Sequence, residues 1–293
     1  MKQICLQDAG IDASPRTTEV SLYPDIDNTF TPVSYEGERL VARRRQTFGF
    51  KQLGSMSASK QGMAIYGDIL VRMANVATST THIIYRIMPT GILEEIATFS
   101  NSSVGHSNAL QFAPSLEAGQ TYPYLYVANL DLKCSVLSIA SDFSVTKVQT
   151  ITIDVAGAGG NILIGDDGYI WSATLDSNDH YHFVKFRRVA VSEGDVTLTD
   201  ADVLDEWSSQ ETWPYATYVW QGMMVKFGKV WFVYGQTQNS DQRRGIAVYD
   251  TATHAFVTNL DLSGVEYELE DIDAWADSVI LATYSAPYYI LKF

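Results

Sequence analysis

Five polar residues open short apolar runs along the chain, and they are the first candidates for chemistry. In each case a turn and a second apolar run follow, as in Gln61–Asp68 and Gln221–Gly228. The five residues are Gln61, His106, Asn161, Gln221 and Glu270. Amides, an imidazole and a carboxylic acid form directed hydrogen bonds to hydroxyl or phosphate groups, so together they could hold a glycan. The alternative is that they bond loop backbone or channel waters, as buried polar groups must.

Aromatic residues gather beside the start at Gln221. Those nearest in sequence are Trp213, Tyr215 and Trp220. Aromatic rings beside amides suit carbohydrates, because the C–H faces of sugars stack on rings while their hydroxyl groups pair with polar side chains. We therefore count these three as candidate ligand contacts, although such rings could also pack inside the fold. Core packing is what we expect of Trp171, Trp231 and Trp275.

Other motifs fit metal, phosphate or nucleophile chemistry less well. His180 and His182 alternate along a presumed strand and so share a face, but no third metal ligand is near in sequence. Asp166-Asp167-Gly168 lacks the frame of a calcium loop. Gly157–Gly160 leads into a strand, whereas a phosphate cradle needs a helix. We therefore expect no metal and no cofactor, and we assign no catalytic residue.

A glycoside hydrolase is the enzyme class that we consider as an alternative. Its chemistry requires two carboxyl groups about 5–9.5 Å apart, so the sequence should bring paired acids to the site. Only the last start brings acids to the expected axis, as Glu270, Asp271 and Asp273. The other starts offer amides and a histidine. The pattern therefore favours binding over catalysis.

These candidates must be positioned by strands, because the sequence is made of short strand-like runs. Turn sequences such as Phe227-Gly228-Lys229 separate runs rich in Val, Ile, Thr and aromatic residues. The five starts are 45, 55, 60 and 49 residues apart. Such spacing suits four-stranded blades whose first strands line a central channel. The sequence predicts an all-β fold, a five-bladed β-propeller, with a β-sandwich as the alternative.

The two ends of the chain complete this prediction. The last unit, Glu270–Phe293, has room for only three strands. Gln46–Leu53 could supply the missing outer strand, which would close the ring and remove an open sheet edge. We expect Met1–Arg45 to form an N-terminal arm or linker and Gln46–Phe293 to form the propeller.

Composition and charge exclude several classes of protein. The chain has 20 Lys and Arg against 34 Asp and Glu, and its net charge of −14 argues against a nucleic-acid partner, which basic residues would have to hold. No apolar run approaches the roughly 18 residues of a membrane helix, so we expect no membrane insertion. The N-terminus lacks the apolar core of a signal peptide. The compartment stays open, with an extracellular or cell-surface location as the working expectation.

One stretch resembles a known family. Gln61 opens a strand, Tyr85-Arg86-Ile87 lies in a later strand with Gly91 in its turn, and Gly105-His106-Ser107 opens the next unit. The β-propellers of phage receptor-binding proteins and of teichoic-acid-associated bacterial proteins carry a comparable Gln, an Ile-Arg step followed by Gly, and Gly-His-Gly. The resemblance covers about a sixth of the chain and departs from the pattern at Ser107. It implies a platform for a surface glycan, with Gln61 and His106 in the channel.

The sequence thus predicts a non-catalytic module that binds a carbohydrate or a cell-surface receptor. A protein-interaction scaffold with no small ligand is the second hypothesis, and a glycoside hydrolase is the third. We expect the ligand to be a neutral or zwitterionic glycan, because among the five starts only Glu270 carries a fixed negative charge.

Overall fold

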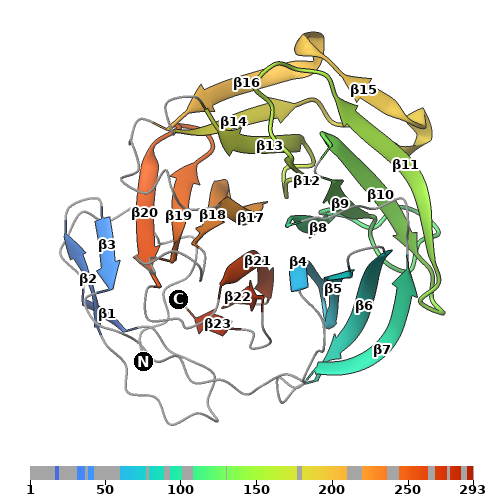
Figure 1. Ribbon diagram of the computed structural model, residues 1–293, viewed down its shortest axis with the longest axis horizontal. Helices are drawn as coiled ribbons and strands as arrows, with labels where there is room; N and C mark the ends of the chain where they lie inside the picture. The colour runs from blue at the N-terminus through green and yellow to red at the C-terminus, as the bar shows by residue number, and fades with distance from the viewer. Residues whose placement is uncertain are drawn as a thin grey trace.

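Strands form nearly all of the regular structure in the computed structural model, and their sheets are arranged in a ring (Figure 1). The structure describes residues 17–19, 32–36, 39–42, 60–76, 79–88, 93–100, 108–129, 131–176, 180–209, 220–235, 244–262, 268–275, 278–284 and 289–292. Within these ranges no helix has the length and apolar character needed to cross a membrane. The fold is an all-β propeller, as the sequence predicts.

Four sheets have the four or more strands of a complete blade. The first contains β4 (Lys60–Tyr66), β5 (Ile69–Val76), β6 (Ser79–Ile87) and β7 (Leu93–Ser100). The second contains β8 (Leu110–Phe112), β9 (Leu125–Asn129), β10 (Lys133–Ile139), β11 (Val145–Ile153) and β15 (Val196–Leu198). The third contains β12 (Asn161–Ile164), β13 (Ile170–Leu175), β14 (Tyr181–Phe186) and β16 (Val203–Ser208). The fourth contains β17 (Trp220–Lys226), β18 (Lys229–Tyr234), β19 (Gly245–Asp250) and β20 (Phe256–Asp261).

A shorter sheet lies between the fourth and the first. It has three strands, β21 (Leu269–Trp275), β22 (Ser278–Thr283) and β23 (Tyr289–Lys292), and β21 packs against both β4 and β17. The prediction of five full blades is therefore met only in part, because the described residues form four full blades and this three-stranded sheet. The predicted closing strand, Gln46–Leu53, lies outside the described residues.

The N-terminal segment contains a separate antiparallel sheet of β1 (Thr17–Glu19), β2 (Pro32–Glu36) and β3 (Arg39–Ala42). Strand β3 lies beside β20, outside the ring (Figure 1). These three strands lie within Met1–Arg45, which the sequence predicts to be an arm or linker. The domain boundary at Arg45 stays a prediction.

Tight hairpins join the inner strands to the next strands outward. In the β17–β18 turn, Phe227 and Gly228 have φ values of 60° and 66°, the two positive values that a type I′ turn requires. Every residue of β9 and of β12 is buried. Continuous apolar runs of this kind are typical of strands covered on both faces, which is why the inner and middle strands of each blade lack an alternating pattern.

Aromatic side chains fill the space between the third and fourth sheets. The ring of Phe183 lies 4.3 Å from that of Trp207 and 5.5 Å from that of Tyr249, between ring centroids. Trp207 also stacks on His254 at 4.9 Å, and His254 Nε2 lies 2.8 Å from Asp205 Oδ2. Packing of these rings therefore helps to join the two blades.

Two of the three tryptophans expected in the core are fully enclosed. Trp171 and Trp231 are each 1% exposed, which confirms that expectation. Trp275 is half-buried, and its indole Nε1 donates to the backbone oxygen of Gly67 at 3.1 Å. It therefore ties the end of β21 to the β4–β5 turn of the neighbouring blade.

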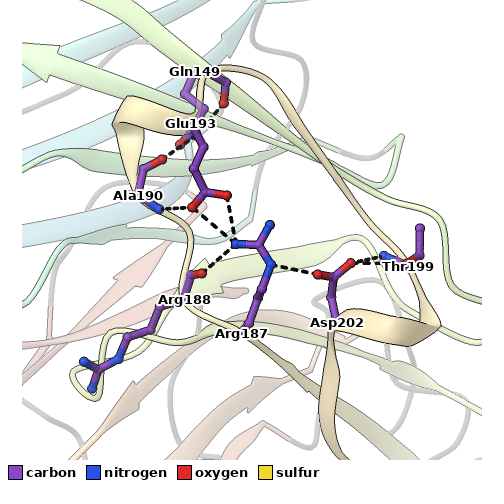
Figure 2. A network of polar contacts seen from close by, with 8 residues as sticks. Gln149, Arg187, Arg188, Ala190, Glu193, Thr199 and Asp202 are labelled. Carbon is purple, nitrogen blue, oxygen red and sulfur yellow. Dashed lines mark hydrogen bonds and ion pairs between the residues drawn. The ribbon is translucent and has the colours of Figure 1, made fainter.

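The connection between β14 and β16 crosses to the second sheet. It contains the short 3-10 helices η2 (Val191–Glu193) and η3 (Asp200–Asp202) on either side of β15, which pairs in parallel with β11. Arg187 holds both helices, since its Nη1 donates to Glu193 Oε2 at 2.9 Å and its Nε to Asp202 Oδ1 at 2.7 Å (Figure 2). Gln149 of β11 donates to the carbonyl of Ala190 at 3.1 Å. Strand β15 thus pairs with one sheet while its sequence belongs to the next.

Candidate functional site

Four of the five predicted polar residues lie buried at the starts of inner strands. Gln61 is 6% exposed, Asn161 and Gln221 are each 3% exposed, and Glu270 is 1% exposed. They belong to β4, β12, β17 and β21, which lie nearest the centre of the ring (Figure 1). We call this region the mouth and define it by Gln61, Asn108, Asn161, Gln221, Glu268 and Glu270.

The remaining predicted contacts are outside what the structure describes. His106, Trp213 and Tyr215 fall in ranges that are not described. Trp220 is the first residue of β17, but its side chain is likewise not described. The roles of these four residues stay predictions.

Three inner strands carry a β-bulge at the predicted polar residue. The register shifts fall between Lys60 and Met63, between Trp220 and Met223, and between Leu269 and Asp271. A bulge takes a residue out of the ladder and changes the direction of its side chain. The residues within these shifts are Gln61 and Gly62, Gln221 and Gly222, and Glu270. The Gln-Gly-Met sequence at residues 61–63 and 221–223 is therefore the local signature of a bulge at the mouth.

A chain of hydrogen bonds links side chains from different sheets. Gln221 Nε2 donates to Glu268 Oε1 at 2.8 Å, and Gln221 Oε1 accepts from Asn108 Nδ2 at 2.5 Å. Asn161 Nδ2 donates to the backbone oxygen of Gln221 at 2.5 Å. The structure thus brings together Asn161 and Gln221, as the sequence predicts, and adds Asn108 and Glu268 to them.

Gly222 allows this close approach of the strands. A Cβ atom at this position would overlap with Asp271 Oδ1 and with the backbone oxygen of Asn108. Any larger residue would push β17 away from β21 or from the segment before β8. The glycine after Gln221 therefore has a steric reason, and the bulge alone does not account for it.

Two ionisable side chains, Glu270 of the mouth and Arg72, are buried close enough for their charges to interact. Arg72 of β5 is 0% exposed and donates through Nη2 to the backbone oxygen of Thr283 at 2.9 Å. Burial, with a further contribution from Glu268, raises the pKa of Glu270 to about 9 against the opposing effect of Arg72. Glu270 is therefore protonated at neutral pH, and the mouth is less negative than its sequence suggests.

Some polar atoms of the mouth are buried without a hydrogen-bond partner among the described residues. They are Gln61 Oε1, Asn108 Oδ1 and Glu270 Oε2. Buried polar atoms in folded proteins are nearly always paired, with protein, water or ligand. These oxygens are therefore the groups of the mouth whose hydrogen-bonding capacity the described residues leave unused.

Beneath the mouth, acidic side chains of β21 pair with the free edge of β4. Asp271 Oδ2 accepts from the backbone N–H of Met63 at 2.6 Å, and Asp273 Oδ2 accepts from that of Ile65 at 2.6 Å. Asp273 Oδ1 also lies 2.5 Å from Lys226 Nζ. Burial raises the pKa of Asp271 well above its ordinary value, against the effect of these N–H donors. Asp271 and Asp273 thus accept hydrogen bonds from backbone N–H groups near the axis. From the sequence alone, the two residues are candidates for the acids that a glycoside hydrolase would need.

Gln111 is a further side chain near the axis that bonds the backbone of a neighbouring sheet. Gln111 of β8 donates through Nε2 to the carbonyl of Val225 at 3.3 Å and accepts from its N–H at 3.4 Å. The amide of Gln111 therefore replaces one rung of a β-ladder for β17. Side chains from β8 and β21 thus bond the backbone of the inner strands β17 and β4 below the mouth.

The histidine pair contacts neighbouring strands of its own sheet. His182 Nδ1 lies 3.0 Å from Ser208 Oγ, and His182 Nε2 lies 3.1 Å from Glu206 Oε1. His180 Nδ1 lies 3.7 Å from Asp176 Oδ2. Over the described ranges no group of three or more His, Cys, Asp or Glu residues could hold a metal ion.

Several residues of the site escaped the sequence pattern. Asn108 lies two residues after His106, and Glu268 lies two residues before Glu270, so the alternation of strand side chains could have indicated both. The sequence pattern did not indicate that Arg72 is buried, because this residue interrupts the apolar run Ile69–Met73 in the way that a solvent-facing residue would. Its complete burial follows from the neighbouring sheet, which no local pattern contains.

Comparisons with known proteins bear on the fold alone. No family model matches the sequence, and no curated protein matches it. Many solved chains match the structure. One is the selenomethionine-substituted virginiamycin B lyase from Staphylococcus aureus, with a TM-score of 0.41 and 11% sequence identity over 84% of this chain and 99% of that chain. The resemblance to phage receptor-binding propellers finds no support in these comparisons.

Proposed function

We propose that this chain is a non-catalytic propeller that binds a carbohydrate, or a glycan-bearing cell-surface receptor, at the mouth. The observation that carries the proposal is the set of buried side chains from several sheets that converge there with oxygens left unpaired. A few placed polar groups, held rigidly by a scaffold, are what orients a small polar ligand. Bulges at three of the inner strands supply that placement.

A glycan array with the wild-type chain and the Gln221→Ala variant tests this proposal. Removing the Gln221 amide leaves Asn108 and Glu268 without their shared partner, so binding should weaken by about 1–3 kcal/mol. Gln120→Ala, in the connection between β8 and β9, is a matched control that removes an amide far from the mouth. Binding that is equal in all three proteins would refute the proposed site. In that case the stretch from Trp207 to Trp220, with Trp213 and Tyr215, becomes the next candidate.

A glycoside hydrolase is the second candidate, and one observation favours it. Glu270 is held protonated beside Glu268, and two carboxyl groups of unequal acidity are the pair that acid-assisted glycoside cleavage uses. Against it, both groups come from the start of β21, and the next acids along that strand, Asp271 and Asp273, accept backbone hydrogen bonds. Turnover of any chromogenic glycoside that is lost in Glu270→Gln would replace the binding proposal with this one.

We also propose that β21, β22 and β23 act as a fifth blade whose outer strand is Gln46–Leu53. The support is that a three-stranded sheet would otherwise leave β23 as an open edge beside complete blades. Deleting Met1–Arg45 removes β1 to β3 and keeps the closing strand, so deleting Met1–Leu53 should lower the melting temperature further than that shorter deletion. The melting temperatures of the two deletion variants are measured by circular dichroism. Equal values would refute the proposal that Gln46–Leu53 closes the fifth blade.

A further inference from the structure

Three amide NH₂ groups of the mouth already donate within the protein, whereas several of its oxygens have no partner among the described residues. Asn108 Nδ2, Asn161 Nδ2 and Gln221 Nε2 each donate a hydrogen bond within the protein. Among the residues that define the mouth, the buried atoms without a partner in the described part of the chain are oxygens, on Gln61, Asn108 and Glu270. A ligand that pairs with the amide oxygens of Gln61 and Asn108 must bring N–H or O–H donors of its own.

The orientation of the amides is fixed by Glu268. An ionised carboxylate only accepts hydrogen bonds, so Gln221 must present its NH₂ group to Glu268 and its oxygen to Asn108. Asn108 must then present its NH₂ group to Gln221, which leaves the oxygen of Asn108 as the free end of the chain. Reversing any one amide would place two donors or two acceptors against each other. The excess of acceptors is therefore a property of the whole chain of bonds.

The charges around the mouth favour a cation among the possible donors. Glu268 lies beside the start of β21 and acts on Glu270 as a negative charge, whereas Glu270 itself is protonated, and the positive group that acts on Glu270 is Arg72. Arg72 is fully buried and bonded to the backbone at Thr283. The net charge of −14 also attracts cations from solution. A protonated amine forms charge-assisted hydrogen bonds, which are roughly twice as strong as neutral ones.

On the basis of the proposed glycan-binding function, we propose that the mouth selects a hydroxylated ligand that carries a protonated primary amine, as an amino sugar does. The ammonium group binds among the oxygens of Asn108, Glu268 and Glu270, and the hydroxyl groups donate to Gln61. A cation beside Glu270 favours its ionised form, because opposite charges stabilise each other. Binding therefore releases protons from Glu270 to the solvent and turns its carboxyl group into a pure acceptor.

Titration calorimetry with three sugars that share one ring tests the selection. Glucosamine, N-acetylglucosamine and glucose differ only in the group at one carbon, which is a charged donor, a neutral amide or a hydroxyl. The titrations are run at pH 6, below the pKa of about 8 for such amines, in two buffers of different protonation enthalpy. Glucosamine should bind about tenfold more tightly than glucose, with net proton release that the two neutral sugars do not show.

Variants connect that preference to the named residues. Glu270→Gln should remove the proton release and reduce the preference for glucosamine, and Asn108→Ala should weaken all three sugars. Glu117→Gln is the matched control, because it also removes one acidic residue but lies exposed between β8 and β9. It should bind like the wild-type chain.

The outcomes separate this inference from the function on which it rests. Equal affinity for the three sugars, lost in Asn108→Ala, would leave the mouth as a glycan site and overturn the selection of an amine. A preference for glucosamine that persists in Glu270→Gln, or that comes without proton release, would overturn it too, because the amine would then bind elsewhere on the acidic surface. If none of the three sugars binds, or if Asn108→Ala weakens the binding of none of them, both proposals are overturned.

Discussion

Glu270→Gln should stabilise the protein at neutral and alkaline pH. The buried side chain of Glu270 has a pKa of about 9, against an ordinary value of 4.5 in the unfolded chain. Between these two pH values the folded protein holds a proton that the unfolded chain has lost. The free energy of unfolding contributed by this group is therefore fully present below pH 4.5 and falls as the pH rises toward 9.

The size of the effect follows from the distance between the two pKa values. Each pH unit above 4.5 lowers the free energy of unfolding by about 1.4 kcal/mol, so the cost of Glu270 at pH 7 is about 3 kcal/mol. Glutamine keeps the shape of the side chain and cannot ionise. The variant should match the wild-type chain near pH 4 and exceed it by about 3 kcal/mol at pH 7.

Urea unfolding at pH 4.5, 7 and 8.5, followed by tryptophan fluorescence, measures this difference. Glu94→Gln in β7 is the control, because this side chain is exposed and its substitution should add no comparable dependence on pH. A difference between Glu270→Gln and the wild-type chain that stays constant over the three pH values would refute the reasoning. It would mean that Glu270 ionises in the folded protein as readily as in the unfolded chain.

Other substitutions test other parts of the ring. His82 is fully buried and stacks on Phe99 at 4.5 Å, and burial lowers its pKa to about 3. Because the unfolded chain takes up a proton below pH 6.5 and the folded chain does not, the wild-type protein should lose about 2 kcal/mol at pH 5 relative to His82→Phe, as measured by urea unfolding at pH 5 and 7. Gly222→Ala should destabilise the fold by about 1–3 kcal/mol in the same assay, because its Cβ overlaps with atoms of β21 and of Asn108. Arg187→Gln should speed amide exchange in β15 and leave β17 unchanged, because only the first depends on the helices that Arg187 holds.

The positions of the inner strands could be predicted because each one repeats a local pattern. Gln61-Gly62-Met63 and Gln221-Gly222-Met223 mark the starts of two inner strands, and the apolar residues that follow indicate that these strands are buried. The same pattern brought Gln61, Asn161, Gln221 and Glu270 to the mouth. The bulges were not predicted, because a shift of one residue in a ladder depends on the partner strand as much as on the strand itself.

Contacts between sheets were beyond the sequence pattern. Asp271 and Asp273 read as candidate acids, and their pairing with the N–H groups of Met63 and Ile65 depends on how the last sheet meets the first. Those residues are 208 positions apart in the chain. The burial of Arg72 has the same origin. Local composition indicates which residues are polar, whereas the ring decides which of them are enclosed.

Strand β15 couples the second and third blades in the structure, and it also couples the order in which they can be completed during synthesis. During synthesis from the N-terminus, β8 to β11 are complete at Ile153, yet the strand that covers the edge of β11 arrives only with Val196–Leu198. In that interval the edge of β11 is open, and open edges pair readily with other chains. An insertion or a new chain terminus placed between Ile153 and Val196 would separate an edge from its cover. A circular permutation that keeps this pairing local must therefore move the second and third blades as one unit.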